Sequence, residues 1–236
     1  MPEIEVRLRH RAGPLDLDVA FSLSAPWTAL FAPSGAGKTT ILRMIAGLDQ
    51  PDAGRISLAN GKVLFDSERR IFVLPHRRGV RMVPQRPALF PHLAVSRNLQ
   101  YGSHSRDSLD PLLALCRIAH LRDKMPSQLS GGERQRVALA RTLASFPAHL
   151  LLLDEPFTGL EASLRDDIIH DLRAWTILQK TSVLLVTHDI GEVFAADAHV
   201  VRMEAGRIVA SGLPSDVLAT ERDRMLARLN NTVGEL

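Results

Sequence analysis

The first part of the chain alternates between hydrophobic and polar residues in the way that β-strands require. Two alternating runs cover residues 4–8 and 15–23, and each run predicts a strand. A short apolar segment at 28–32 leads into a glycine-rich turn. Apolar residues with helical spacing follow at 38–46, and Gly47 supplies a stop signal. The pattern predicts a strand, a turn and a helix in direct succession.

A β-hairpin is predicted in the next part of the chain. Two short strand-like runs cover residues 55–58 and 62–65. Asn60-Gly61 lies between them, and this dipeptide favours the tight turns that connect hairpin strands. Residues 79–83 indicate one further strand.

The pattern becomes helical from about residue 86 to residue 147 and then alternates again. Helices are predicted in this middle region at 108–119 and 132–145, with prolines at 91, 111 and 126. The last third predicts strands and helices in turn, namely a strand at 150–153, a helix at 161–179, a strand at 182–187, a hairpin of 200–203 with 207–210, and a helical tail at 215–236.

Strands that alternate with helices are typical of an α/β fold with a mostly parallel sheet and helices on both faces. We expect one domain over residues 1–236. Its core would come from 1–85 and 147–236, and residues 86–146 would form an inserted helical subdomain.

Composition excludes several functional classes. The chain has 236 residues, of which 45% are hydrophobic and 23% charged, as in ordinary globular proteins. The net charge of +3 is small and dispersed, and aromatic residues are only 5%, so we expect no nucleic-acid partner. The single cysteine, Cys116, cannot form an internal disulfide. No apolar run reaches the ~18–20 residues that span a bilayer, and the start lacks the apolar core of a signal peptide. We therefore expect a cytoplasmic protein.

The glycine-rich turn has the composition of a phosphate-binding loop. It reads Ala-Pro-Ser-Gly-Ala-Gly-Lys-Thr over residues 32–39, between the predicted strand and helix. Gly35 and Gly37 would let backbone N–H groups approach phosphate oxygens, and the helix N-terminus would add positive charge. Lys38 would neutralise the β- and γ-phosphates, and Thr39 would place a hydroxyl on Mg²⁺. The alternative is a plain strand–helix turn with a surface lysine.

Two adjacent carboxylates follow the buried strand at 150–153. Asp154 is suited to hold Mg²⁺ through a coordinated water. Glu155 would point elsewhere and act as general base on an attacking water. The alternative is a strand that ends in an acidic, solvated turn.

A second anion-binding helix end is predicted at residues 129–136. Ser130 can cap the helix, and Gly131 and Gly132 leave its first N–H groups open. An ordinary capped helix would explain Ser130, but it does not explain two consecutive glycines, which are poor helix formers.

Two single polar residues follow predicted strands. Gln85 comes after the strand at 79–83, and His188 comes after the strand at 182–187. Ligands collect outside the carboxyl ends of parallel strands, so both side chains could reach a γ-phosphate. Each residue taken alone is more often structural.

Together these motifs resemble those of the ATP-binding cassette ATPases. The order APSGAGKTT, VPQ, LSGGERQR, LLLLDEPFTGLE and VTHD matches that family over most of the chain. The resemblance implies a P-loop NTPase (RecA-like) core sheet, an antiparallel β subdomain and a helical subdomain. It implies ATP and Mg²⁺ as cofactors, and contacts to ATP from Ser34, Gly35, Ala36, Gly37, Lys38, Thr39 and Thr40.

The resemblance also implies a head-to-tail homodimer with two ATPs at its interface. Ser130, Gly131 and Gly132 of one copy would complete the ATP site of the other. Catalytic roles would fall to Glu155, to His188, which would contact the γ-phosphate, and to Gln85. Gln85 would also sense the Mg²⁺ ion, which Thr39 and Asp154 would bind.

The stretch from residue 63 to residue 102 is similar to that of molybdate-importer ATPases. It reads VLFDSERRIFVLPHRRGVRMVPQ and, after a short gap, LFPHLAVSRNLQYG. This similarity implies that the chain binds membrane permease subunits and acts indirectly with an extracytoplasmic solute-binding protein. It also implies that the chain lies on the cytoplasmic face of the cell membrane. Leu89, Phe90 and Leu93 would suit a docking groove for the permease, or a plain helical core. The identity of the transported solute stays open, with tungstate, sulfate, a sugar or another solute as the alternatives to molybdate.

Several residues depart from the family pattern. Ala32 replaces the usual first glycine, Glu161 replaces a usual aspartate, and Pro84 replaces a usual aromatic. The segment that normally supplies an adenine-stacking aromatic offers only His10. The sequence ends at Leu236, so a C-terminal oxyanion-binding regulatory domain is not expected on this chain.

Two other functions stay open. One is a non-transport ATPase of the same fold that acts on DNA or ribosomes, against which the weak charge and the absence of a long coiled-coil insertion argue. The other is a nucleotide-binding regulatory subunit with little hydrolysis, which the departures at Ala32 and Glu161 favour.

Overall fold

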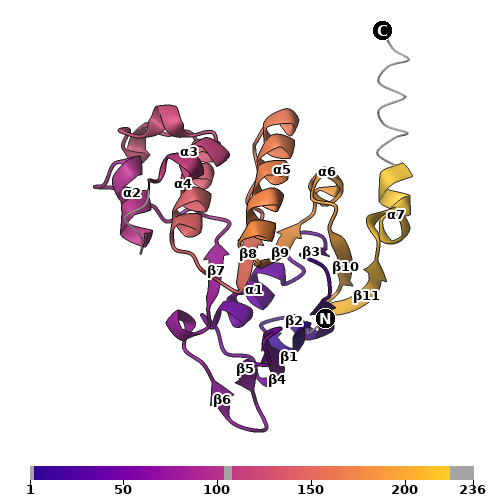
Figure 1. Cartoon of the computed structure of the whole chain (residues 1–236). Helices are drawn as coiled ribbons and strands as arrows, with labels where there is room; N and C mark the ends of the chain where they lie inside the picture. Colours follow the sequence, from indigo (N-terminus) through magenta and orange to yellow (C-terminus); the bar gives the residue numbers. More distant parts are fainter. Residues whose placement is uncertain (1–2, 104–107, 224–236) are drawn as a thin grey trace.

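A single mixed β-sheet with helices on both faces organises the chain. The computed structural model describes residues 3–103 and 108–223. Eleven strands form one sheet within this part, in the order β6-β5-β4-β1-β2-β11-β10-β3-β9-β8-β7. The sheet runs from the antiparallel strands at one end to the parallel strands near the helices (Figure 1).

The parallel part of the sheet carries the strand ends that matter for the site. All four neighbouring pairs within it are parallel. In spatial order it consists of β10 (His199–Glu204), β3 (Trp27–Phe31), β9 (Ser182–Thr187), β8 (Leu150–Asp154) and β7 (Val80–Val83).

The antiparallel part begins with the predicted N-terminal strands. Residues 4–12 and 15–23 pair along their whole length. The Asn60-Gly61 hairpin is confirmed, because the strands on either side of it pair antiparallel. This part consists of β1 (Ile4–Ala12), β2 (Leu15–Leu23), β4 (Ala53–Ser57), β5 (Val63–Asp66) and β6 (Ile71–Phe72). The strand β11 (Arg207–Gly212) joins the two parts, because it pairs antiparallel with β10 and parallel with β2.

Helices cover both faces of the sheet. Between β7 and β8 the described residues form only helices and loops, which lie together at one end of the molecule (Figure 1). The α-helices are α1 (Lys38–Ala46), α2 (Val95–Gly102), α3 (Asp110–Leu115), α4 (Gly131–Ala144), α5 (Ala162–Leu178), α6 (Ile190–Ala195) and α7 (Pro214–Val217), with short 3-10 helices at Pro75–Arg77, Ala119–Leu121 and Pro126–Gln128.

Two hydrophobic cores lie on opposite faces of the parallel strands. In β8, Leu151 and Leu153 belong to the core beneath α2–α6, whereas Leu150 and Leu152 belong to the core beneath α1. All four leucines are fully buried. An uninterrupted apolar run is what a strand needs when both of its faces are covered.

Most predicted elements match the structure to within one or two residues, and the largest difference lies in the middle region. The predicted helix 108–119 is the shorter α3, because the chain leaves the helix at Cys116 and Arg117 adopts a left-handed backbone with φ 55°. Of the predicted helical tail, α7 and residues 219–223 are helical, and the remainder from 224 lies outside the described residues. No helix among residues 3–103 and 108–223 is long and apolar enough to cross a membrane.

Candidate functional site

The turn between β3 and α1 is shaped by two glycines. Gly35 and Gly37 have φ values of 80° and 94°, in the left-handed region that side chains disfavour. A Cβ on Gly37 would lie 2.6 Å from Cδ2 of Leu15 and 2.8 Å from Cδ2 of Leu17. The loop therefore packs directly on β2, and α1 begins at Lys38 with its N-terminus at the loop.

The Lys38 side chain folds back over its own loop. Its Nζ donates hydrogen bonds to the carbonyl oxygens of Ala32 at 2.7 Å and Pro33 at 3.0 Å, and the side chain is 5% exposed. Burial lowers the pKa of Lys38, whereas the charges of Glu155 and Asp154 oppose that shift. The ammonium group thus binds two carbonyl oxygens of the loop and lies near the carboxylates of Glu155 and Asp154. An anion that entered the loop could replace the carbonyl oxygens as its partner.

Asp154 and Thr39 meet at the carboxyl end of β8. The Thr39 hydroxyl donates to Oδ1 of Asp154 at 3.1 Å. The other oxygen, Oδ2, is buried without a hydrogen-bond partner in the described part of the chain. Burial raises the pKa of Asp154, and the Thr39 hydrogen bond partly opposes this. A buried carboxylate oxygen without a partner beside a hydroxyl is a donor set that suits Mg²⁺.

Glu155 lies where three other groups converge. Its Oε2 accepts a hydrogen bond from Nε2 of Gln85 at 2.9 Å, and its Oε1 lies 3.2 Å from Nδ1 of His188. Nζ of Lys38 is 3.7 Å from the same Oε1. Glu155 has φ 46°, so the backbone turns sharply after Asp154. That turn separates the two adjacent carboxylates, one toward Thr39 and the other toward Gln85 and His188.

The N-terminus of α4 forms a separate group of predicted site residues. Ser130 accepts a hydrogen bond from the backbone N of Glu133 at 3.2 Å, and its own N donates to the Glu133 carboxylate at 2.7 Å. This reciprocal capping box stabilises the first turn. A Cβ on Gly132 would lie 2.9 Å from Cδ2 of Leu160, so glycine allows the helix end to approach the loop after Glu155. Gly131 faces open space.

Most of the residues described above lie in one segment that matches a known protein family. Residues 18–158, which include both glycine-rich segments and both carboxylates, match the family model described as ABC transporter.

The chain belongs to the ABC transporter family.

Relatives and solved structures agree with this membership. The chain is 42% identical over 221 residues to the "Molybdenum import ATP-binding protein ModC" of Rhizobium meliloti, an alignment that covers 91% of the chain and 61% of that relative. The chain thus spans about three fifths of the length of this relative. Membership of the ABC family makes the chain a nucleotide-binding protein.

Two solved structures have the same fold. One is cbiO1 from Clostridium perfringens, part of the ABC transporter complex cbiONQ, with a TM-score of 0.75, 26% identity and 98% of each chain covered. The other is a dimeric ATP-binding cassette in a post-hydrolysis state bound to ADP and Pi, with a TM-score of 0.74 and 23% identity, covering 90% of this chain and 98% of that one. The predicted P-loop NTPase fold, with its parallel core sheet, is confirmed.

The departures from the ABC pattern fit locally. Ala32 is buried in the core beneath α1, and its backbone lies outside the left-handed region, so glycine is not required there. Glu161 is the N-cap residue of α5, and its Oε1 accepts from the Ser163 hydroxyl at 3.0 Å. His10 lies on β1 with its Nδ1 3.3 Å from Asp52, beside the adjoining antiparallel strands.

Gln135 is a residue that sequence reasoning missed. This side chain on α4 is buried, and its Nε2 donates to the carbonyl oxygen of Pro84 at 3.1 Å. It ties α4 to the residue before Gln85 and so connects the two predicted ATP-contacting segments. Only its polar character on an otherwise apolar helix face could have indicated it.

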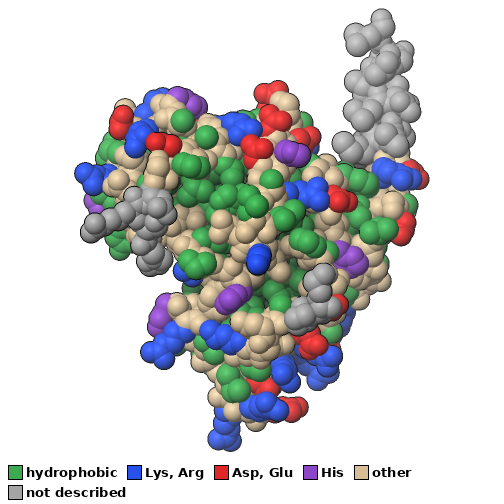
Figure 2. Space-filling view, in the orientation of Figure 1, with side chains coloured by type: hydrophobic (Ala, Val, Ile, Leu, Met, Phe, Trp, Pro, Cys, Tyr) green, Lys and Arg blue, Asp and Glu red, His purple; other side chains and the backbone are tan. Residues whose placement is uncertain are grey.

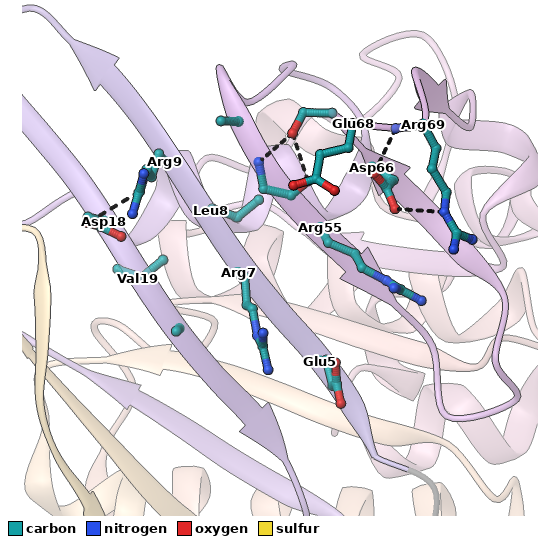
Figure 3. A pocket seen from close by; sticks show the side chains of 14 residues that line it. Glu5, Arg7, Leu8, Arg9, Asp18, Val19, Arg55, Asp66, Glu68 and Arg69 are labelled. Atoms are coloured by element: carbon teal, nitrogen blue, oxygen red, sulfur yellow. Dashed lines mark hydrogen bonds and ion pairs between the residues drawn. The ribbon is translucent and has the colours of Figure 1, made fainter.

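A wide cleft on the antiparallel strands is chemically unlike the site around Lys38. It has a volume of about 550 Å³ and lies over β1, β2, β4 and β5 (Figure 3). Its charges are partly paired among themselves, with Arg9 3.5 Å from Asp18 and Arg69 3.9 Å from Asp66. None of the residues that line it belongs to the turn before α1 or to the strand ends at Asp154 and His188. The cleft therefore contains none of the residues that the sequence predicts to contact ATP.

Proposed function

We propose that this chain is the ATP-hydrolysing subunit of an ABC importer that takes up an inorganic oxyanion, most directly molybdate. The observation that carries the proposal is the convergence of Lys38, Gln85 and His188 on Glu155, beside the Thr39–Asp154 pair. The 42% identity to a protein named for molybdenum import supports the choice of solute.

The turn before α1 would bind the triphosphate. Lys38 would exchange the carbonyl oxygens of Ala32 and Pro33 for the β- and γ-phosphate oxygens, which are stronger partners for an ammonium group. The first N–H groups of α1 have no helical acceptors, so they would donate to phosphate together with those of the loop. The contacting residues would be Ser34, Gly35, Ala36, Gly37, Lys38, Thr39 and Thr40.

Asp154, Thr39 and Gln85 would hold Mg²⁺. The Oδ2 atom of Asp154 is buried without a partner, and the Thr39 hydroxyl is directed at the same carboxyl group. Mg²⁺ would supply charge neutralisation on the β- and γ-phosphates. The carboxamide oxygen of Gln85 would be a third ligand, because its Nε2 is used on Glu155.

Glu155 would act as the general base in hydrolysis. The side chain is 11% exposed and carries two oxygens at which a water could lose its proton. Gln85 and His188 each bind one of these oxygens, so they would fix the carboxylate where the attacking water must lie. His188 is half exposed, which leaves its ring free to turn toward the γ-phosphate.

A homodimer would complete each site. Ser130, Gly131 and Gly132 form a capped helix end. Ser130 is hydrogen-bonded to Glu133 and Gly132 lies close to Leu160, so neither contact involves the turn before α1. In a head-to-tail pair, this end would bind the ATP of the other copy. In Figure 2, hydrophobic side chains gather across the middle of the face shown, over the region of α4 and α5, as expected of a surface that meets another protein.

The region after Gln85 would receive the membrane permease. Phe90 is partly buried, with its ring centroid 4.3 Å from that of Tyr101, and Tyr101 is 71% exposed. Leu89 and Leu93 are partly buried nearby in sequence. The chain would work at the cytoplasmic face of the membrane through this contact, and a solute-binding protein would act on the other side. Residues 86–146 would serve as the helical subdomain between core segments 1–85 and 147–236.

Uptake into vesicles tests this function. Membrane vesicles that contain the permease subunits and this chain on the ATP side should accumulate molybdate only when ATP is present. Glu155→Gln is the matched control, because it keeps the fold and removes the base. Uptake of sulfate or a sugar in place of molybdate would contradict the proposed solute. Recovery of nucleic acid and no permease in a pull-down would overturn the transport function.

A further inference from the structure

A buried acid behind His188 has no part in the reaction described above. Glu192 lies in the first turn of α6 and is 4% exposed, and its Oε2 has no hydrogen-bond partner in the described part of the chain. Burying a carboxyl group costs free energy unless its oxygens are satisfied. An acid at such a position therefore calls for an explanation beyond packing.

The Glu192 carboxyl group lies near the end of the strand that precedes His188. The neighbouring hydroxyl of Thr187, the last residue of β9, favours the charged form of Glu192 and so lowers its pKa. The same Thr187 oxygen accepts the backbone N–H of Asp189 at 2.9 Å. This bond spans His188 and fixes the backbone that carries the imidazole.

The turn is also fixed from α5. Oδ2 of Asp189 accepts from Nη1 of Arg165 at 3.0 Å, and its Oδ1 accepts from the backbone N of Gly191 at 2.7 Å. A Cβ on Gly191 would lie 2.8 Å from Nη2 of Arg165, so the turn and α5 are in close contact. With the Asp189 side of the turn held, Thr187 is the other point at which the segment can be fixed.

We propose that Glu192 is a positioning residue for His188: through the Thr187 hydroxyl it holds the turn so that the imidazole reaches Glu155. The 3.2 Å approach of His188 Nδ1 to Glu155 Oε1 is the contact that this arrangement maintains. The inference rests on the proposed ATPase function, since it assigns a role within the same site.

The charge state of Glu192 is sensitive to its surroundings. Burial raises its pKa to about 7, and the Thr187 hydrogen bond opposes this shift. The charged groups that face it are Asp189 in the turn, Arg165 on α5 and Glu155 after β8. Hydrolysis by the wild-type protein should therefore depend on pH near 7 in a way that a neutral acceptor at this position would remove.

Paired substitutions test the proposal. Glu192→Gln keeps an oxygen that can accept from Thr187, so kcat should stay within about twofold. Glu192→Leu removes the acceptor, so kcat should fall about tenfold while KM for ATP changes less than about twofold. Thr187→Ser and Thr187→Val form a second pair with the same expected difference, should the leucine variant fail to fold.

A stability control separates positioning from simple damage. Thr176→Val removes a buried hydroxyl that accepts from the Trp27 indole at 3.0 Å, on a part of α5 away from the turn. It should lower Tm and leave kcat unchanged. Equal losses of kcat in Thr176→Val and in the folded Glu192→Leu or Thr187→Val variants would overturn the proposal.

The His188 imidazole gives a readout that needs no hydrolysis. Its NMR signals in the full chain should shift in Glu192→Leu and Thr187→Val, and they should match wild type in Glu192→Gln and Thr176→Val. Unchanged signals in the first pair would contradict the positioning role. A wild-type protein that hydrolyses no ATP with its permease would instead contradict the proposed function, while the imidazole signals would still decide the role of Glu192.

Discussion

Gln85 and Glu155 are 70 residues apart in the sequence, and a 2.9 Å hydrogen bond joins Nε2 of Gln85 to Oε2 of Glu155. Gln85 follows β7 and Glu155 follows β8, and these strands are parallel neighbours. Their carboxyl ends therefore meet at one edge of the sheet. This bond links the residue at which the helical region begins, Gln85, to the predicted catalytic base, Glu155.

Breaking that bond should slow hydrolysis more than it weakens nucleotide binding. In Gln85→Ala, one Glu155 oxygen loses its donor while Lys38 and the glycine-rich turn remain intact. We expect kcat to fall by about tenfold to a hundredfold with a small change in KM for ATP. Steady-state ATPase assays check this, and a rise in KM at constant kcat would show that Gln85 contributes to binding instead.

The role of Thr39 should appear in the magnesium dependence. Thr39→Val has nearly the same shape and lacks the hydroxyl that donates to Asp154 at 3.1 Å. The Mg²⁺ concentration for half-maximal ATPase activity should rise about tenfold or more, corresponding to ~1.4 kcal/mol or more of lost binding free energy. Thr39→Ser should restore the wild-type value. If Thr39→Val had the wild-type magnesium requirement, the assigned metal site would be wrong.

Gly37 should not tolerate a side chain. Gly37→Ala would place a methyl group 2.6 Å from Leu15 and would hold alanine at φ 94°. We expect a loss of about 1–3 kcal/mol in the free energy of unfolding. Gly35→Ala is the matched control, because its φ is also positive but no atom lies within 4 Å of its Cβ. Denaturant unfolding should show the larger loss for Gly37→Ala, and equal losses would mean that backbone strain alone accounts for the effect.

The raised pKa of Glu192 makes stability depend on pH. The pKa rises from 4.5 to about 7 on folding, so the folded state binds more protons than the unfolded state between these values. The stabilising contribution of the protonated acid is complete below about 4.5 and is lost as pH rises through 7. Glu192→Gln lacks this titration and should gain on the order of 2–3 kcal/mol over wild type between pH 4.5 and 8. Urea unfolding across this range checks it, and a difference that is constant with pH would contradict it.

The sequence predicted those parts of the fold that local patterns encode. The helix at 38–46 was predictable because Gly47 stops the apolar periodicity, and the Asn60-Gly61 hairpin because its turn chemistry is specific. Four leucines at 150–153 indicated a strand covered on both faces. The two-residue β6 was missed, because so short a strand has no periodicity of its own.

Contacts between distant segments could not be predicted in the same way. Motif order identified Gln85, Glu155 and His188 one by one, but their mutual distances depend on how β7, β8 and β9 pair. The burial of Glu192 was not predictable either, because nothing in the neighbouring sequence shows that this residue of α6 lies in the interior. The same holds for Gln135, whose partner is the carbonyl oxygen of Pro84.

The most direct test of the account is the assembly state of Glu155→Gln with Mg-ATP. Without the base, ATP should stay bound between Lys38 of one copy and Ser130 of the other, so light scattering should report a stable dimer with one ATP per chain. Adding Ser130→Phe to this variant should return the protein to monomers that still bind nucleotide. A Glu155→Gln protein that remains monomeric with ATP bound, or a dimer that Ser130→Phe does not disturb, would contradict the shared site.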